Sequence, residues 1–240
     1  MAWHYSFEKY WRNSEIDTWT DPEDIWHWWW NYTWFPTWAA ETLEIFSSDV
    51  ADNWVTPWTW ALTVQITNLL DWTWAAMPDI TVTLNWTTPV SLWAQTYYRC
   101  TRAIVLTAWS SWSNTWTLTL RHTTTTANIF SVMPALMNQT ATAAFTVPLW
   151  QTLYVKRINM QMARLSWAAW SAAMTFRARP NWQVFNAVLS PEITQGSSYT
   201  FENNWYQIFT ARTDIKVRCE KVSDNNTVIT ADFSGFLIDD

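Results

Sequence analysis

Apolar and polar residues alternate in short runs from Glu41 onward, and turn-forming residues separate these runs. In "ITVTL" (80–84), apolar residues alternate with threonine, which is the two-residue period of a half-buried strand. A partner strand, expected to begin at Val90, would fold back against it through the turn at Asn85 and Trp86. Helical periodicity is nearly absent, so the pattern predicts an all-β chain.

The predicted strands have one face toward a core and the other toward water. They are 41–48, 61–68, 79–85, 90–94, 97–107, 116–121, 127–133, 142–147, 152–162, 172–179, 183–189, 198–203, 206–211, 215–222 and 227–238. Many short strands separated by turns are typical of a sandwich or barrel. We therefore expect an antiparallel β-sandwich of jelly-roll type over 41–240, as one domain without an internal linker.

Residues 1–40 show little alternation and mix acidic side chains with aromatic residues and proline. This composition predicts an extended N-terminal arm. An arm of this kind cannot bury itself, so it is expected to become ordered by lying on a neighbouring subunit. A free disordered tail is the alternative.

Composition adds an anomaly, because the chain has 24 Trp and two Gly. Glycine usually supplies about 7% of residues, or about 17 in a chain of this length. Many of the tryptophans occupy turns between predicted strands, where positive φ favours glycine. Five follow Asn or Asp directly, in the place where Asx-Gly closes a tight turn: Trp54, Trp72, Trp86, Trp182 and Trp205.

We hypothesise that most Trp letters stand where the fold requires glycine, as if one codon had been read under the wrong genetic code. A genuinely Trp-rich protein is the alternative, and Trp26 is the residue most readily kept as a true tryptophan. A chain with Gly at these sites must weigh clearly less than 28.4 kDa, so its intact mass distinguishes the two.

Charge and cysteine content limit the partners that we expect. The net charge of −6 argues against binding to nucleic acid. Cys100 and Cys219 lack a CxxC or His-rich neighbourhood, so reduced thiols are expected, with a single disulfide as the alternative. No apolar run reaches the length of a membrane span, and no signal peptide is recognised, so the product is expected in the cytosol without a membrane partner.

Motifs for catalysis or metal binding are weak. His4, His27 and His122 are scattered along the chain, and no GxSxG, HExxH or P-loop motif is present. The candidates for a pair of catalytic carboxylates are Asp214, Glu220, Asp232, Asp239 and Asp240, whose spacing predicts nothing. We expect no catalytic residue, no metal site and no cofactor.

Several arginines fall inside predicted strands, where they could pair with carboxylates at a subunit interface. They are Arg99, Arg102, Arg157, Arg164, Arg177, Arg179, Arg212 and Arg218. The acidic arm is their natural counterpart, while solvent-facing arginine that keeps a sheet soluble is the alternative.

Reading Trp as Gly turns 22–37 into "PEDIWHGGGNYTGFPT" and 81–90 into "TVTLNGTTPV". These strings, with "FTVPLWQTLYVKRINMQM" (145–162) and "TDIKVRCEK" (213–221), resemble a group of tailed-bacteriophage virion proteins. In that group, an acidic arm with an "EDIW"-like motif precedes a β-domain. The resemblance spans most of the chain but depends on the substitution at the Trp sites, and it carries over no catalytic residue.

The resemblance implies a structural role in the virion, without enzymatic activity. We expect a capsid decoration or accessory protein that forms a homotrimer and contacts the major capsid protein or other virion proteins. A neck or tail protein is a close alternative. If the Trp residues are genuine, loops such as "HWWWNYTW" (27–34) instead favour a carbohydrate-binding adhesin. A capsule-degrading enzyme is a third possibility, for which the chain offers no defensible acid pair.

Overall fold

A computed structural model describes residues 4–26, 40–49, 61–85, 87–92, 95–108, 113–164, 171–181 and 183–240. Within these ranges the chain is all-β, and every strand pairing is antiparallel. The strands are β1 (His4–Ile16), β2 (Glu23–Asp24), β3 (Leu43–Ser47), β4 (Ala61–Leu70), β5 (Ile80–Thr83), β6 (Val90–Ser91), β7 (Arg99–Ala108), β8 (Leu118–His122), β9 (Ile129–Met133), β10 (Ala144–Thr146), β11 (Gln151–Arg164), β12 (Ser171–Arg179), β13 (Asn186–Leu189), β14 (Glu192–Thr194), β15 (Ser198–Phe209), β16 (Asp214–Val222) and β17 (Thr227–Asp239).

The chain forms two compact units rather than an arm and one domain. The first unit contains Met1–Tyr32 and Thr142–Asp240, and the second contains Thr33–Ala141. The second unit is therefore inserted between two strands of the first, β2 and β10. Because the first unit is built from both ends of the chain, a boundary drawn at residue 40 does not separate its parts.

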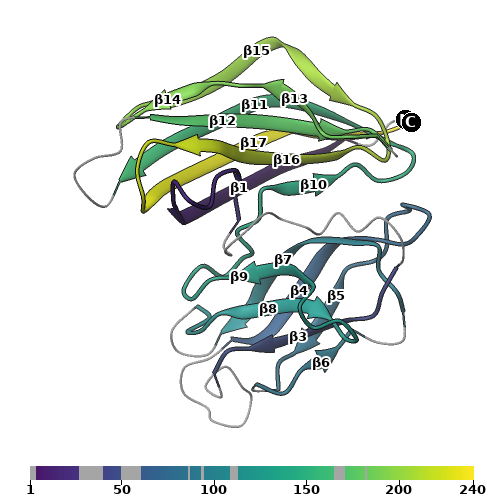
Figure 1. Ribbon diagram of the computed structural model, residues 1–240. Coiled ribbons are helices and arrows are strands. Elements are labelled where there is room, and N and C mark those ends of the chain that lie inside the picture. The colour runs from purple at the N-terminus through teal and green to yellow at the C-terminus, as the bar shows by residue number, and fades with distance from the viewer. Residues whose placement is uncertain are drawn as a thin grey trace. The chain divides into compact units, whose positions relative to one another are not determined.

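The first unit consists of two sheets that share one hydrophobic core (Figure 1). One sheet has the order β1-β17-β11-β15, and the other has the order β10-β16-β12-β13, with β14 beside β12 and β2 beside β16. Phe176 of the second sheet lies with its ring centroid 5.3 Å from Phe233 and 5.9 Å from Phe209 of the first. Face-to-face packing of this kind removes apolar surface of both sheets from water.

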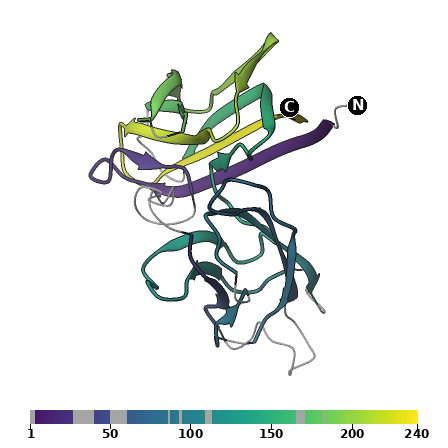
Figure 2. The same cartoon turned by 90° about the vertical axis from the view of Figure 1, so that its right-hand side faces the viewer.

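The prediction of an extended N-terminal arm is wrong for residues 4–16. These residues form β1, which is an edge strand of the chain's own sheet. It pairs with the C-terminal strand β17 from His4↔Ile238 to Ile16↔Thr227 (Figure 2). Trp11 is fully buried, with its ring centroid 4.8 Å from that of Phe233. The strand escaped the sequence pattern because two inward-facing residues, Lys9 and Asn13, are polar.

The second unit contains a sheet of order β6-β3-β8-β9 and a sheet of order β5-β4-β7. The hairpin expected between 79–85 and 90–94 is wrong, because β5 pairs with β4 while β6 pairs with β3. An isolated bridge, Asn85↔Thr88, lies in the turn between the two segments. The alternating pattern identified both strands, but it could not specify their partners.

Most predicted strands are present with small changes at their ends. The two predicted strands at 198–203 and 206–211 are parts of one strand, β15, whose register shifts opposite Val155 and Arg157. Sequence reasoning missed β1, β2 and β14. The two shorter ones, with two and three residues, are too brief for a recognisable period.

Gly235 has a packing role in β17. A Cβ atom at this position would lie 1.9 Å from the carbonyl oxygen of Tyr154 on β11. The close approach occurs beside the irregularity between Val155 and Arg157, where β11 shifts its register against both neighbouring strands. The close contact between the two backbones therefore requires glycine at position 235.

The tryptophans at turns occupy contrasting environments. Trp150, between β10 and β11, has φ of 64° and is 71% exposed. Trp74 has φ of 74°, but it is buried against Tyr98. Trp72 is also exposed, whereas Trp26 is buried. Of the other turn sites, 54, 86 and 182 lie outside the described residues, as does the side chain of residue 205.

At these two positive-φ sites, substitution by glycine is expected to have opposite effects on the free energy of unfolding. Trp150→Gly should raise the free energy of unfolding by roughly 0.5–1 kcal/mol, because it relieves left-handed strain and removes little packing. Trp74→Gly should lower it by about 2 kcal/mol, because the lost contacts outweigh the relieved strain. Urea denaturation of both variants tests this expectation, and destabilisation by Trp150→Gly would contradict it.

Candidate functional site

The acidic motif "PEDIW" (22–26) forms a clip on the first unit. Its strand, β2, pairs with β16 through Asp24↔Arg218 and Glu23↔Cys219. The Lys216 ammonium donates a hydrogen bond of 2.7 Å to Asp24 Oδ2. Arg218 Nε lies 4.0 Å from Asp24 Oδ1. Burial lowers the pKa of Lys216, and the carboxylate of Asp24 acts in the opposite direction. The clip thus holds a buried ion pair within one chain.

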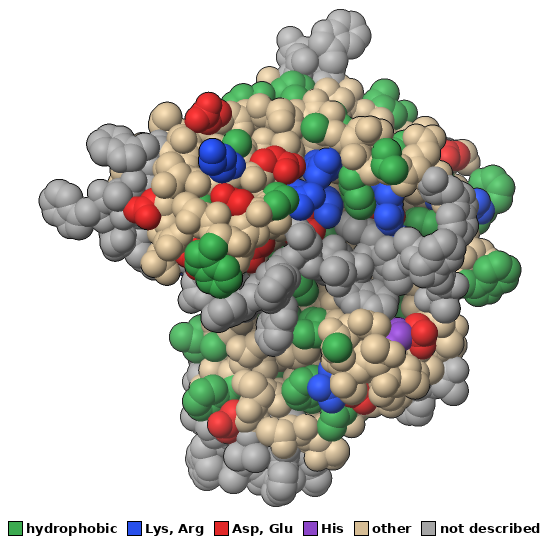
Figure 3. Space-filling model, viewed as in Figure 1, with side chains coloured by type: hydrophobic (Ala, Val, Ile, Leu, Met, Phe, Trp, Pro, Cys, Tyr) green, Lys and Arg blue, Asp and Glu red, His purple; other side chains and the backbone are tan. Residues whose placement is uncertain are grey.

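The charges continue along the neighbouring strands β12 and β16. Arg179 Nη2 lies 2.6 Å from Asp214 Oδ2, and the Thr146 hydroxyl donates to the other carboxylate oxygen of Asp214. Glu220 accepts a 2.6 Å hydrogen bond from Thr175 and lies 3.5 Å from Arg177. Figure 3 shows basic and acidic side chains next to each other on this unit rather than in separate patches. The charges of this cluster thus have partners of opposite sign, so removal of one partner would be costly.

These pairs account for several arginines that were considered for a subunit interface. Arg218 lies near Asp24 and Arg157 lies near Glu8, both in the predicted arm but in the same chain. Arg177 and Arg179 instead pair with Glu220 and Asp214, which lie outside the predicted arm. Arg99 instead lies buried in the second unit, with its guanidinium carbon 4.2 Å from the ring centroid of Tyr98 and 4.8 Å from that of Trp74. Among the residues that the structure describes, Arg102 and Arg212 form no ion pair. The side chain of Arg164 is outside the described residues.

The structure describes the side chain of one of the three histidines, His122. His122 is buried, with Nε2 3.6 Å from Glu41 Oε2 and its ring stacked on Phe130. Burial lowers its pKa, against the opposing effect of Glu41. His27 and the side chain of His4 are outside the described residues. In the part of the chain that the structure describes, no three His, Cys, Asp or Glu residues form a group that could hold a metal ion.

The five candidate acids are each bonded to a side chain that is not acidic. Asp232 Oδ2 accepts from Asn159 at 2.9 Å, Asp239 accepts from Gln151, and Asp240 accepts from Thr152. Asp214 and Glu220 belong to the charge cluster on β12 and β16. Only Asp232 also lines a described pocket. The arrangement positions these carboxylates for hydrogen bonding within the sheets.

Both cysteines are buried free thiols, which agrees with the expectation of reduced cysteine. Cys219 lies on the buried face of β16 together with Ile215 and Val217. Burial is the largest cause that raises the pKa of its thiol. A raised pKa and a buried position make Cys219 a poor nucleophile.

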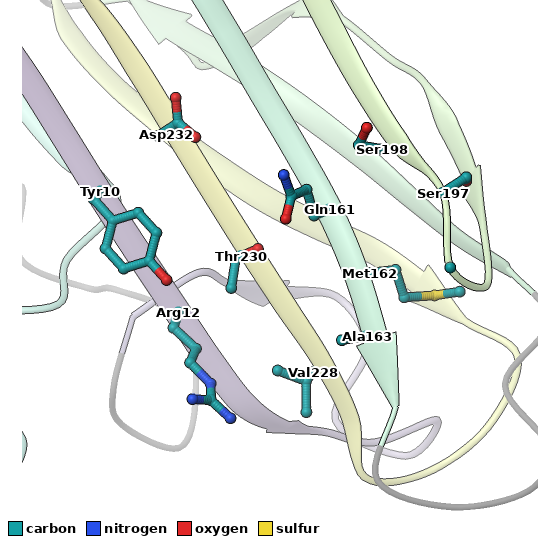
Figure 4. Close-up of a pocket in the computed structure, with 11 residues that line it drawn as sticks. Tyr10, Arg12, Gln161, Met162, Ala163, Ser197, Ser198, Val228, Thr230 and Asp232 are labelled. Carbon is teal, nitrogen blue, oxygen red and sulfur yellow. The ribbon is translucent and has the colours of Figure 1, made fainter.

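A pocket of about 590 Å³ lies on the outer face of the sheet β1-β17-β11-β15 (Figure 4). Figure 4 shows side chains from β1 on one side and from the start of β15 on the other, with β17 and β11 between them. Its lining is largely polar: Tyr10, Arg12, Gln161, Met162, Ala163, Gly196, Ser197, Ser198, Val228, Thr230 and Asp232.

Strand register explains how these side chains meet. Arg12 lies opposite Thr230, Thr230 lies opposite Gln161, and Gln161 lies opposite Ser198. These residues therefore form one row across four strands. The next row begins with Tyr10 opposite Asp232. Alternation directs Trp11 and its inward-facing neighbours into the core, which leaves the polar rows on the outer face.

An aromatic cluster occupies the same face farther along β11 and β17. Tyr154 and Phe236 are stacked, with ring centroids 5.5 Å apart and an interplanar angle of 11°. Tyr206 meets both rings edge-on. Tyr206 and the neighbouring Ile208 are partly exposed. The face thus combines polar rows with an accessible apolar surface.

Sequence reasoning named Asp232 but missed the rest of this face. The available signal was the row of polar residues at alternate positions of 152–162 and 227–238. By itself this signal predicts only the solvent-facing side of a sheet. Without β1, nothing in the pattern showed that Tyr10 and Arg12 complete the same surface.

Comparisons of the chain with protein-family models, with curated proteins and with solved structures find no match. Among the described residues, no helix has the length and apolar character that a membrane crossing requires. The Trp-bearing loops considered for an adhesin, "HWWWNYTW" (27–34) and "PWTW" (57–60), lie outside the described residues.

The clip makes a testable contribution to stability. Asp24→Asn should lower the free energy of unfolding by roughly 3–5 kcal/mol, because it leaves the buried Lys216 ammonium without its carboxylate. Glu8→Gln is the matched control, because Glu8 and its partner Arg157 are 68% and 43% exposed. Its effect should stay below about 1 kcal/mol. Equal effects in denaturant titrations would contradict the assigned role of Asp24.

Proposed function

We propose that the chain is a structural component of a tailed-bacteriophage virion, as a capsid decoration or accessory protein. A neck or tail position is the alternative within the same class. In this proposal the chain assembles as a homotrimer, contacts the major capsid protein or other virion proteins, and has no enzymatic activity. It is made in the host cytoplasm and then incorporated into the particle.

One observation carries the proposal: three of the four segments that resemble virion proteins lie wholly or mostly in the first unit, while 81–90 lies in the second. The "PEDIW" segment pairs with β16, which contains most of "TDIKVRCEK". The start of "FTVPLW" lies in β10, which pairs with the other end of β16. Backbone bonds from Ile25 to Val217 and from Ala143 to Ile25 join the three segments. Three segments that are distant in the sequence are therefore neighbours within one structural unit.

The strand order supports a jelly roll as the topology of the first unit. In chain order, its eight main strands are β1, β10, β11, β12, β13, β15, β16 and β17. The first pairs with the eighth, the second with the seventh, the third with the sixth and the fourth with the fifth. A jelly roll contains eight strands in two sheets, and this architecture is used in viral capsids and in lectins.

The insertion also fits a role in assembly. The second unit leaves the first between β2 and β10 and returns to it, so both of its connections originate on the same unit. An insertion of this kind adds surface for contacts without interrupting the pairing of the sandwich strands. A repeated particle protein gains contact area through many equivalent copies.

Quantitative mass spectrometry of gradient-purified particles tests the proposal. We expect peptides of the chain to remain with particles after washing, at a copy number comparable to that of the major capsid protein. A copy number far below that value would instead favour the neck or tail. Presence in the infected-cell lysate together with absence from the purified particles would contradict a virion role.

A further inference from the structure

We propose that the outer face of the sheet β1-β17-β11-β15 binds an acidic polysaccharide, with the carboxylate of one sugar in the pocket beside Arg12. The aromatic cluster of Tyr154, Tyr206 and Phe236 would contact a sugar farther along the same polymer. This binding activity goes beyond a structural role in a particle.

The first argument is the supply of free polar groups. Within the part of the chain that the structure describes, no hydrogen bond or ion pair engages the Arg12 guanidinium, the Gln161 amide or the Tyr10 hydroxyl. Thr230 and Ser198 add hydroxyl groups between and beside them. A pocket with several unengaged donors and acceptors at fixed strand positions is suited to a ligand with many hydroxyl groups.

The second argument is charge. Asp232 of the pocket lining and Glu8, which precedes Tyr10 on the same outer face of β1, both lie 3.6 Å from Arg157. Asp232 also accepts the hydrogen bond from Asn159. Arg12 is therefore the basic residue of the pocket lining, and no acid among the described residues pairs with it. A guanidinium pairs with a carboxylate through two parallel hydrogen bonds, which favours an acidic sugar over a neutral one.

The third argument is the extent of the face. Phe236 lies six residues from Thr230 on β17, and both positions face outward. Six residues of strand span about 20 Å. Tyr206 is 41% exposed at this end of the face, and an accessible ring can pack on the apolar face of a sugar. Two subsites at this separation favour a polymer over a single sugar.

Binding of oligogalacturonate to the full chain tests the inference by isothermal titration calorimetry. The same oligomer with methyl-esterified carboxylates is the neutral control, and polyglutamate is the control for unspecific attraction to a polyanion. We expect oligogalacturonate to bind, with affinity at least about tenfold higher than that of either control.

Variants locate the site. Arg12→Gln should weaken binding at least about tenfold, and Tyr206→Ala should weaken binding of a long oligomer more than that of a single galacturonate. Arg102→Gln is the matched control, because it removes one arginine charge from β7 in the other unit. Both Arg12 and Tyr206 are exposed, so unchanged thermal unfolding is expected and shows that each variant is folded.

Three results would overturn the inference: no binding of oligogalacturonate, equal binding of the esterified oligomer, or equal losses in Arg12→Gln and Arg102→Gln. None of these results bears on incorporation into particles, which is measured separately. Conversely, if the chain binds the sugar but is absent from virions, the binding site is supported and the proposed structural role is contradicted.

Discussion

The pairing of β1 with β17 is the constraint on which the first unit depends. It joins residues from opposite ends of the chain over the length of two long strands, and it places Trp11 against Phe233. The same pairing brings Tyr10 and Arg12 to the outer face beside Thr230 and therefore completes the polar pocket. The packing of the core and the candidate binding face thus both depend on the pairing of β1 with β17.

The clip extends this closure from one sheet to the other. After β1, the chain crosses to the other sheet, where β2 pairs with β16 and Asp24 accepts a hydrogen bond from Lys216. A buried ion pair gains little net stability over an apolar contact, but removal of one partner is costly, so the pair favours one register of the segment. The "EDIW" motif consequently has an architectural explanation. Its acidic residue Asp24 pairs with Lys216 of the same chain.

Alternation was sufficient to predict an all-β chain and most strands, because Val, Ile, Leu and Phe occupy the inward positions of β11, β16 and β17. It failed at β1, where the polar residues Lys9 and Asn13 are buried and obscure the period. Partner choice was also inaccessible, as β5 and β6 illustrate, because alternation assigns a face but not a neighbour. For the same reason, only Asp232 of the binding face was considered from the sequence.

Hydrogen–deuterium exchange on the full chain tests the closure by β1 most directly. The account predicts that the alternate backbone amides of residues 4–16 that face β17 exchange slowly, and that their protection is independent of protein concentration. Rapid exchange of 4–16 beside a protected 227–239 would contradict it. Protection that disappears on dilution would also contradict it, because it would assign the N-terminal segment to a neighbouring copy.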